Sequence, residues 1–306
     1  MERQLMPEPE ISIGVVPAPA SGQCGEERAT VVATSAGIDP GQVPAGFTVD
    51  AFHNGAFHLL QPSGAGHRAG MDAMLLAATV PEAARGSLAD LGAGAGAAGL
   101  AAASRLTDLE VVLVERATAM AHCARATLEL AANAHLAARA RVIEADVTLR
   151  GAQRRAVGLA DEAHDYVIMN PPFNSGRDRK TPDPLKAKAH AMEIEDLFER
   201  WLRTANAILK PGGQVSIIAR PESLGDILMG MGKRFGGVEI TPVRPRIGDD
   251  AIRILVTAIK GSRARMLLRD QILLHDGPGH ALSPQMSDLS NGRVAWMRRS
   301  KIRPPR

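Results

Sequence analysis

The sequence predicts an α/β fold in which a mostly parallel sheet carries helices on both faces. Three observations support this prediction. Short apolar runs alternate with longer helical patterns from residue 88 to residue 220, as in sheets whose parallel strands are joined by crossover helices. The runs are rich in aliphatic residues, which is typical of strands covered on both faces. Two further apolar runs, residues 237–243 and 251–259, are predicted to form a final antiparallel pair.

Residues 1–44 are predicted to form a disordered or loosely packed tail. Pro, Gly, Ala, Ser and Thr dominate this segment, and residues 1–50 hold seven acidic residues against two basic ones. A segment of this composition buries too little apolar surface to fold alone. The sequence therefore places the folded domain in residues 45–260.

Overall composition narrows the class of protein. The 306 residues suffice for one large or two modest domains, and the formal net charge of +3 is compatible with a polyanionic partner without requiring one. Cys24 and Cys123 are the only cysteines, which suits a reducing compartment and provides neither a disulfide framework nor a metal site. With no signal peptide and no apolar run of membrane-spanning length, we expect a cytoplasmic protein.

Residues 45–86 are expected to form a small amino-terminal part made of a hairpin and a helix. The alternating pattern from Phe47 to Leu60 surrounds Asn54-Gly55, which is a typical hairpin turn. A glycine-rich loop, residues 64–70, comes next. Residues 71–80 are then predicted to form a helix that ends at Pro81.

Residues 87–260 are expected to form the core that contains the sheet. The strands that precede the antiparallel pair are predicted at residues 88–91, 110–115, 141–144, 165–169 and 214–219, and the helices at residues 97–105, 117–138 and 193–209. Apolar residues recur at helical spacing in the last helix, so Phe198 and Trp201 are interpreted as core residues rather than as a platform for a substrate. Pro211-Gly212-Gly213 is expected to end that helix.

A four-residue turn follows the strand predicted at residues 165–169. It consists of Asn170, Pro171, Pro172 and Phe173. Two consecutive prolines cannot continue a sheet, and they keep the backbone extended and stiff. The Pro171 carbonyl and the Asn170 side-chain carbonyl are two hydrogen-bond acceptors, and the Phe173 ring offers a face that can stack on a nucleobase. The turn is interpreted as a socket for a planar NH2 group, although proline pairs also occur in turns without a function.

Several polar or glycine-rich turns are expected to converge at one edge of the sheet. The glycine turn at residues 92–96, Glu115, Asp146 and the Asn-Pro-Pro-Phe turn each follow a predicted strand. Open α/β sheets bind ligands outside the carboxyl ends of their strands, at the point where the strand order reverses. These residues are therefore predicted to line one crevice.

The glycine turn is compatible with two kinds of cofactor. In one reading, Gly94, Gly96 and Gly99 match the dinucleotide fingerprint, and Glu115 accepts from a ribose. Such a site uses the start of the helix to hold a pyrophosphate. A lone match of this kind is a weak signal.

In the other reading, the same turn is part of a longer motif with a carboxylate at its head. Asp90 and Gly92 precede the two glycines, and a carboxylate at residue 90 would repel a pyrophosphate but would help to hold an ammonium, such as that of S-adenosylmethionine. Glu115 would accept from both ribose hydroxyls and Asp146 from the adenine amino group. Asn170, at the end of another strand, is placed in both the cofactor-binding and the catalytic set.

These residues resemble the class I methyltransferases of the small domain type, which use S-adenosylmethionine. Residues 90–96 look like the first motif of that class, and residues 170–173 look like the Asn-Pro-Pro-(Tyr/Phe) motif of enzymes that methylate planar amino groups. The resemblance covers residues 46–260 and implies a Rossmann-like, seven-stranded methyltransferase sheet, mostly parallel, with an antiparallel last strand. Residues 66–76 look like the Gly-Tyr-Arg-x-x-x-Asp-x-x-Leu-Leu stretch of bacterial tRNA (adenine-N6)-methyltransferases that act on valine tRNA, with His67 in place of Tyr.

The resemblance implies methyl transfer to the exocyclic N6 amine of an adenine in RNA, and in particular in tRNA near the anticodon. No general base is assigned, because the methylated amine becomes acidic enough to lose its proton to water or to the Asn170 carbonyl. Residues 176–190 hold five Lys and Arg against two acidic residues, and residues 261–306, a basic carboxyl-terminal extension, hold nine against three. Such segments can neutralise RNA phosphates. The residues expected to bind the substrate are Phe173, Arg177, Arg179 and Lys180.

Three other functions remain open. A protein-glutamine N5-methyltransferase would fit a side-chain amide into the same socket, but the helical amino-terminal domain of those enzymes has no counterpart in residues 1–46. A non-catalytic RNA-binding module would not need the complete set of acids and the Asn-Pro-Pro-Phe turn. A nicotinamide oxidoreductase lacks visible residues that would handle a hydride.

Overall fold

The computed structural model describes residues 43, 45–63, 69–172 and 197–299. Every element named below lies in residues 36–306, one of the two units into which the chain divides. The predicted tail, residues 1–44, lies outside the described residues except for residue 43.

A hairpin and a short helix precede the main sheet. Strands β1 (Phe47–Phe52) and β2 (Phe57–Pro62) pair in antiparallel register, and the 3-10 turn η2 (His53–Gly55) joins them. Asn54 adopts a φ of +54°, as tight hairpin turns require of their central residues. Helix α1 (Met71–Ala78) follows. The predicted hairpin and helix are confirmed.

The main sheet contains the seven expected strands. They are β3 (Gly86–Leu91), β4 (Leu109–Glu115), β5 (Ala140–Glu144), β6 (His164–Met169), β7 (Leu209–Ala219), β8 (Phe235–Arg244) and β9 (Arg253–Lys260). Their order is β8-β9-β7-β6-β3-β4-β5, and all are parallel except β9, which runs antiparallel to both neighbours. This order confirms the predicted mostly parallel sheet with an antiparallel last strand.

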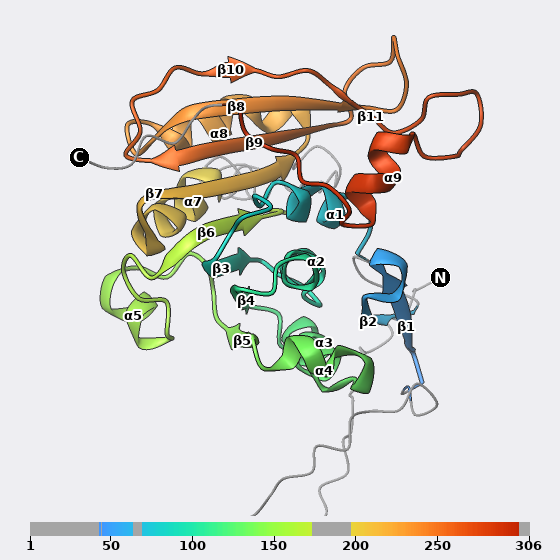
Figure 1. The fold of residues 1–306 in the computed structure, drawn as a ribbon. Helices are drawn as coiled ribbons and strands as arrows, with labels where there is room; N and C mark the ends of the chain where they lie inside the picture. The colour runs from blue at the N-terminus through green and yellow to red at the C-terminus, as the bar shows by residue number, and fades with distance from the viewer. Residues whose placement is uncertain (1–42, 44, 64–68, 173–196, 300–306) are drawn as a thin grey trace, which may run out of the picture. The chain divides into compact units, whose positions relative to one another are not determined.

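Helices cover both faces of the sheet (Figure 1). Helices α1, α2 (Ala97–Arg105), α3 (Thr118–Glu129) and α4 (Ala134–Ala137) pack on one face, and α5 (Gly151–Ala156), α7 (Leu197–Ile208) and α8 (Leu224–Met231) pack on the other. Each face has its own apolar core. Within β3, Leu88 belongs to the core under α2, whereas Ala89 and Leu91 belong to the core under α7. Because side chains alternate along a strand, Asp90 lies on the α2 side.

The prediction of one long helix at residues 117–138 is wrong. Helix α3 ends at Glu129, and Leu130 adopts an extended conformation before a 3-10 turn and α4. The Asn133 amide donates both to the Thr127 carbonyl, at the end of α3, and to the His58 carbonyl on β2, each at 2.7 Å. A contact with the hairpin therefore ends the helix, and local helix propensity does not reveal it.

The boundary between α7 and β7 also differs from the prediction. The helix ends at Ile208, and β7 begins at Leu209, so Pro211-Gly212-Gly213 lies within the strand rather than at the end of the helix. The register of β6 and β7 shifts between His164 and Tyr166. Residues 211–213 lie in the irregular stretch opposite this shift, where proline and glycine are tolerated.

The carboxyl-terminal extension joins the sheet. Two short strands, β10 (Leu267–Leu268) and β11 (Ile272–Leu273), pair in parallel with β8 and extend the sheet to nine strands. Helix α9 (Pro284–Ser290) packs against α1. Farther along, the Trp296 backbone donates to the Ala78 carbonyl at 2.8 Å, and its indole donates to Thr241 Oγ1 at 2.9 Å. The extension thus crosses the α1 face.

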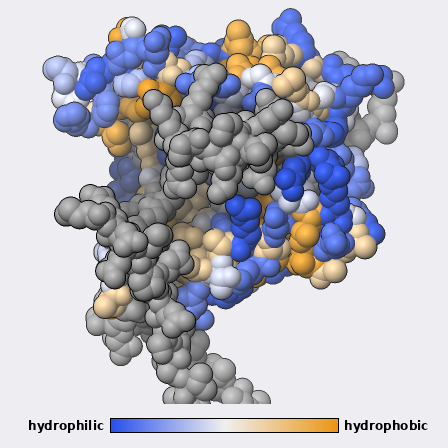
Figure 2. Space-filling model, turned by 180° about the vertical axis from the view of Figure 1, so that it is seen from behind, coloured by the Kyte–Doolittle hydropathy of each residue, from blue (hydrophilic) through white to orange (hydrophobic). Residues whose placement is uncertain are grey.

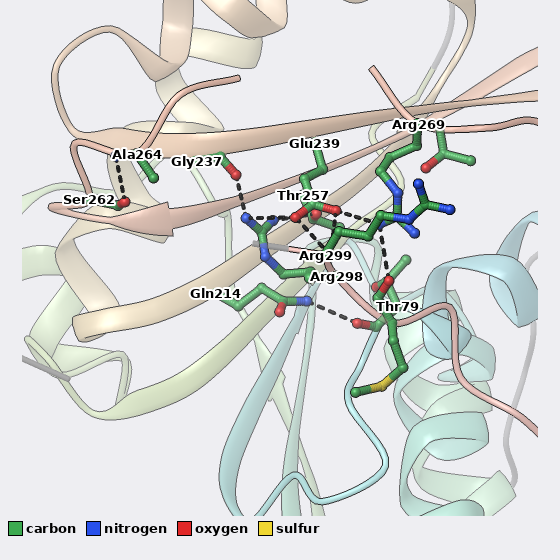
Figure 3. Close-up of polar contacts among 12 residues, drawn as sticks. Thr79, Gln214, Gly237, Glu239, Thr257, Ser262, Ala264, Arg269, Arg298 and Arg299 are labelled. Carbon is green, nitrogen blue, oxygen red and sulfur yellow. Dashed lines mark hydrogen bonds and ion pairs between the residues drawn. The ribbon is translucent and has the colours of Figure 1, made fainter. Parts of the chain in front are cut away.

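A buried ion-pair cluster fastens both ends of this extension to β8 (Figure 3). The Glu239 carboxylate is 2% exposed and pairs with Arg269 and Arg298, which are themselves almost fully buried. Arg298 also donates to Thr257 Oγ1 and to the Gly237 carbonyl. Two of the cations that the sequence placed in a basic extension are therefore turned inwards, where RNA cannot reach them.

Hydrophilic and apolar side chains are mixed on the described surface in one view of the molecule (Figure 2). Figure 2 shows hydrophilic side chains over much of one face, with apolar residues in smaller areas between them. The exposed large apolar residues in the described part include Met229 on α8 and Ile247 between β8 and β9. None of the helices in the described part is long and apolar enough to span a bilayer.

Candidate active site

Four strands bring the candidate residues to one edge of the sheet. The chain runs from β3 outwards through β4 and β5, and then returns to the other side of β3 with β6. Leu91 pairs with both Val114 and Met169, so Gly92, Glu115 and Asn170 are the next residues on three neighbouring strands. The strand order reverses at this point, which is where open α/β sheets bind their ligands.

Asp90 is a buried acid at the centre of this edge. Its side chain is 3% exposed, and Oδ2 accepts the backbone N–H of Gly99, in the first turn of α2, at 2.8 Å. Burial raises the pKa of Asp90 to about 7; the hydrogen bond from Gly99 opposes the shift, and the charge of Glu115 adds to it. A cation placed beside this group would favour its ionised form.

The glycine turn takes a path that other residues would resist. Gly92, Gly94 and Gly96 all have positive φ, and the backbone N–H of Gly92 donates to the Val114 carbonyl at 2.8 Å. A β-carbon at Gly92 would lie 2.5 Å from the Trp201 ring, whereas one at Gly94 would come no closer than 3.7 Å to Met120. Space beside Gly94 therefore allows a ligand to approach the backbone closely.

Glu115 ends β4 and faces the glycine turn. Its carboxylate accepts the backbone N–H of Gly94 at 2.9 Å and that of Ala117 at 2.8 Å. Each carboxylate oxygen can accept more than one hydrogen bond, so the two oxygens retain capacity for a pair of ligand hydroxyls. The contact to Gly94 also fixes the carboxylate against the loop that would carry the ligand.

Asp146 follows β5 and is held by its own turn. Its Oδ1 accepts the backbone N–H of Thr148 at 2.7 Å. Burial acts to raise the pKa of Asp146, but the hydrogen bonds from Thr148 and the charges of Arg116 and Arg200 outweigh burial, so the pKa lies below its usual value. The group is therefore an ionised acceptor at neutral pH.

The residues after β6 present an acceptor without a partner. Asn170 is half-buried, Pro171 is buried and Pro172 is exposed. Among the described residues, the buried Oδ1 of Asn170 has no hydrogen-bond partner. An orphaned buried acceptor costs free energy, so such a group is a candidate for pairing with a ligand.

Other predicted site residues lie outside the part of the chain that the structure describes. They are Phe173, Arg177, Arg179 and Lys180. Their predicted contacts with the substrate stay predictions.

Sequence reasoning missed the contribution of α7. Arg200 and Thr204 contact the turn after β5, and Trp201, predicted to be a core residue, is buried and packs against Gly92. The spacing of Asp146 and Thr148 is typical of a turn in which an Asp accepts a backbone N–H two residues later, and this signal could have been found. The sequence contains no such signal for Arg200.

An ion pair also lies at the carboxyl edge. The Nε atom of Arg253, the first residue of β9, is 2.8 Å from Oδ2 of Asp72 in the first turn of α1. Asp72 belongs to the segment that resembles the Gly-Tyr-Arg-x-x-x-Asp stretch, and the structure shows that it ties α1 to the sheet.

Comparisons with known proteins agree with this geometry. The sequence model of the methyltransferase small domain family matches residues 65–244. A crystal structure described as a predicted O-methyltransferase, protein Atu636 from Agrobacterium tumefaciens, is 49% identical, covers 75% of this chain and 100% of its own, and has a TM-score of 0.66. No curated protein matches the chain.

Two other solved structures are less similar. A SAM-dependent O-methyltransferase from Thermotoga maritima is 15% identical over 66% of this chain and 69% of its own, with a TM-score of 0.44. TYW2 from M. jannaschii, solved in complex with AdoMet, is 12% identical over 70% of this chain and 85% of its own, with a TM-score of 0.47.

Proposed function

The chain belongs to the methyltransferase small domain family, and from this premise we propose that it methylates the exocyclic N6 amine of an adenine in RNA, with tRNA near the anticodon as the expected substrate. It is an S-adenosylmethionine-dependent methyltransferase. The observation that carries the finer assignment is the Asn-Pro-Pro-Phe turn beside the glycine turn, with Oδ1 of Asn170 unpartnered among the described residues.

The described residues fit S-adenosylmethionine. Asp90 is a buried carboxyl group whose pKa is raised by burial and by the charge of Glu115, so a cation beside it would be favourable, and the cofactor carries both an ammonium and a sulfonium. Gly94 leaves room for close approach, Glu115 can accept from a ribose diol, and Asp146 can accept from an adenine amine. When bound, the cofactor supplies an electrophilic methyl group.

Asn170 and Pro171 position the methyl acceptor. An exocyclic amine is a poor nucleophile because its lone pair is delocalised into the ring. Two hydrogen bonds, from its N–H groups to Asn170 Oδ1 and to the Pro171 carbonyl, would favour a geometry in which the lone pair points away from the protein acceptors. Positioning of this kind supplies about 7–11 kcal/mol in favourable cases. The proton is lost after methylation, to water or to the Asn170 carbonyl.

RNA is favoured as the substrate by the residues that follow. A stacked base must leave its helix to reach the site, which is easiest in a single-stranded loop. Phe173 is proposed to stack on the extruded base, and Arg177, Arg179 and Lys180 to contact phosphates. The basic composition of residues 176–190 and the resemblance to tRNA methyltransferases support these roles.

Oxygen is a less suitable acceptor atom. The 49% identical relative is described as a predicted O-methyltransferase, and transfer to a hydroxyl requires a base that removes its proton. The turns after β3, β4, β5 and β6, residues 92–96, 115–118, 145–148 and 170–172, contain no histidine, and their two carboxylates, Glu115 and Asp146, are assigned to the cofactor in this proposal. These turns suit an amine, which does not need to be deprotonated first.

Methyl transfer from labelled S-adenosylmethionine tests the proposal. Bulk tRNA, bulk DNA and a glutamine-containing release factor serve as acceptors, and nuclease digestion of labelled RNA identifies the modified nucleoside. We expect N6-methyladenosine from tRNA, and none with Asn170→Ala. The control Asn291→Ala, which changes an amide at the residue directly after α9, should retain full labelling. Label only on protein, or only on oxygen, would overturn the proposal.

A further inference from the structure

One turn of α7 supports the Asp146 turn. The Arg200 guanidinium donates to Thr148 Oγ1 at 3.0 Å, and the Thr204 hydroxyl donates to the Val147 carbonyl at 2.6 Å. Positions four apart on a helix lie on the same face, so both contacts reach the turn from a single helical surface. This surface is not part of the sequence motifs that place the cofactor.

Thr148 links this surface to the Asp146 carboxylate. A guanidinium can only donate, so Thr148 Oγ1 accepts from Arg200 and keeps its own hydrogen for another acceptor. That acceptor is Asp146, which receives hydrogen bonds from both the backbone N–H and the hydroxyl of Thr148. Linked hydrogen bonds of this kind polarise one another. The links run from Arg200 through Thr148 to Asp146.

We propose that Arg200 is a positioning residue that acts through Thr148 to orient Asp146 towards a 6-amino group, and so makes the cofactor site selective for adenine. The proposal rests on the assignment of Asp146 to the adenine of S-adenosylmethionine. A carboxylate can accept about four hydrogen bonds, so the contacts from Thr148 leave acceptor positions for a ligand N–H. A carboxylate that rotated freely would be less well directed, and the preference for the amino group would shrink.

Selectivity can be measured with two product analogues. S-adenosylhomocysteine and its counterpart with unsubstituted purine in place of adenine differ only in the 6-amino group. The dissociation constant of the purine analogue divided by that of S-adenosylhomocysteine therefore reports on the contact between Asp146 and this group. A hydrogen bond to a charged group corresponds to a ratio of roughly 10 to 100. The full-length protein is used, and calorimetry gives both constants.

Four variants separate the possible outcomes. Arg200→Met and Thr148→Val should each lower the ratio by roughly 3- to 10-fold, the range of a neutral hydrogen bond. Asp146→Ala, which removes the acceptor altogether, should abolish it. Arg203→Met is the matched control, because it removes an arginine from the same helix whose ion-pair partner is Glu199, at 3.7 Å. It should leave the ratio unchanged.

The results can contradict the proposal in two distinguishable ways. If Arg200→Met and Thr148→Val weaken both analogues equally, their contacts are merely structural and the proposal fails, while the role of Asp146 stands. If Asp146→Ala keeps the ratio, the assignment of Asp146 to adenine fails as well. Thr148→Val keeps the test decisive if Arg200→Met does not fold.

Discussion

The indole ring of Trp201 lies directly against Gly92, so that a β-carbon at residue 92 would come within 2.5 Å of the ring. Helix α7 therefore forms the support on which the glycine turn rests. Gly94, two residues later, has the same left-handed backbone, but a β-carbon there would be only in ordinary contact with Met120, at 3.7 Å. The two glycines are required for different reasons, and this difference can be tested.

Alanine at residue 92 should destabilise the protein more than alanine at residue 94. Gly92→Ala adds both left-handed strain and overpacking against Trp201, together roughly 2–4 kcal/mol in the free energy of unfolding. Gly94→Ala adds only the strain, about 1 kcal/mol, but places a methyl group where the cofactor should approach. Urea denaturation and calorimetric titration with S-adenosylmethionine measure the two effects. If the two variants lost equal free energy of unfolding, overpacking of the new methyl group against Trp201 would not destabilise Gly92→Ala.

Cofactor binding should depend on pH near neutrality because of Asp90. The pKa of Asp90 in the free protein is raised to about 7, and only the ionised carboxylate attracts a cation. Affinity for S-adenosylmethionine should therefore increase as the pH rises towards 7 and level off above it, with proton release on binding below pH 7. Asp90→Asn should bind more weakly and lose this component, so its profile corrects for the other groups. Parallel profiles for both proteins would contradict the prediction.

The same carboxyl group should affect the stability of the cofactor-free protein in the opposite sense. Its folded pKa lies above the unfolded value of 3.8, so the folded state binds more protons between these values. The contribution of Asp90 is then fully present below about pH 4 and is lost as the pH rises through about 7. Thermal unfolding of the wild type and Asp90→Asn from pH 4 to pH 8 measures it. The stabilising effect of Asp90→Asn should be largest at pH 8.

The features of the site that could be predicted are those encoded by neighbouring residues. Apolar runs indicated the strands, and the residues at their carboxyl ends, from Asp90 to Asn170, follow directly from the positions of those runs. The order of parallel strands then places them at one edge. For this reason the sequence alone predicts that the glycine turn, Glu115, Asp146 and the Asn-Pro-Pro turn lie at one edge of the sheet.

The features that could not be predicted depend on contacts between distant segments. Asn133 ends α3 because it also binds His58, 75 residues away. Arg200 meets Thr148 across 52 residues, and Arg298 meets Gly237 across 61. A sequence pattern shows that α7 is amphipathic and that the extension is basic, but it does not show which polar side chains turn inwards.

Asn170 and Asp90 should separate catalysis from cofactor binding. Asn170→Ala removes one acceptor for the substrate amine, and the loss of a preorganised polar group at a reacting centre lowers kcat by roughly 10²–10³-fold. Its affinity for S-adenosylmethionine should stay near that of the wild type. Asp90→Ala should instead weaken the cofactor itself. Single-turnover kinetics at saturating cofactor, combined with calorimetry, tests the split, and the reverse pattern would mean that the two roles are misassigned.

Glu239 should contribute more to stability than any surface ion pair of comparable geometry. Glu239→Gln leaves Arg269 and Arg298 buried without a counter-ion, and breaking a buried pair from one side costs about 3–5 kcal/mol. Asp288→Asn is the control, because its pair with Arg293, at 3.0 Å, is exposed to solvent and should be worth less than ~1 kcal/mol. Chemical denaturation gives both values, and limited proteolysis should release residues 261–306 first in Glu239→Gln. Equal, small losses in the two variants would show that the cluster does not hold the extension on β8.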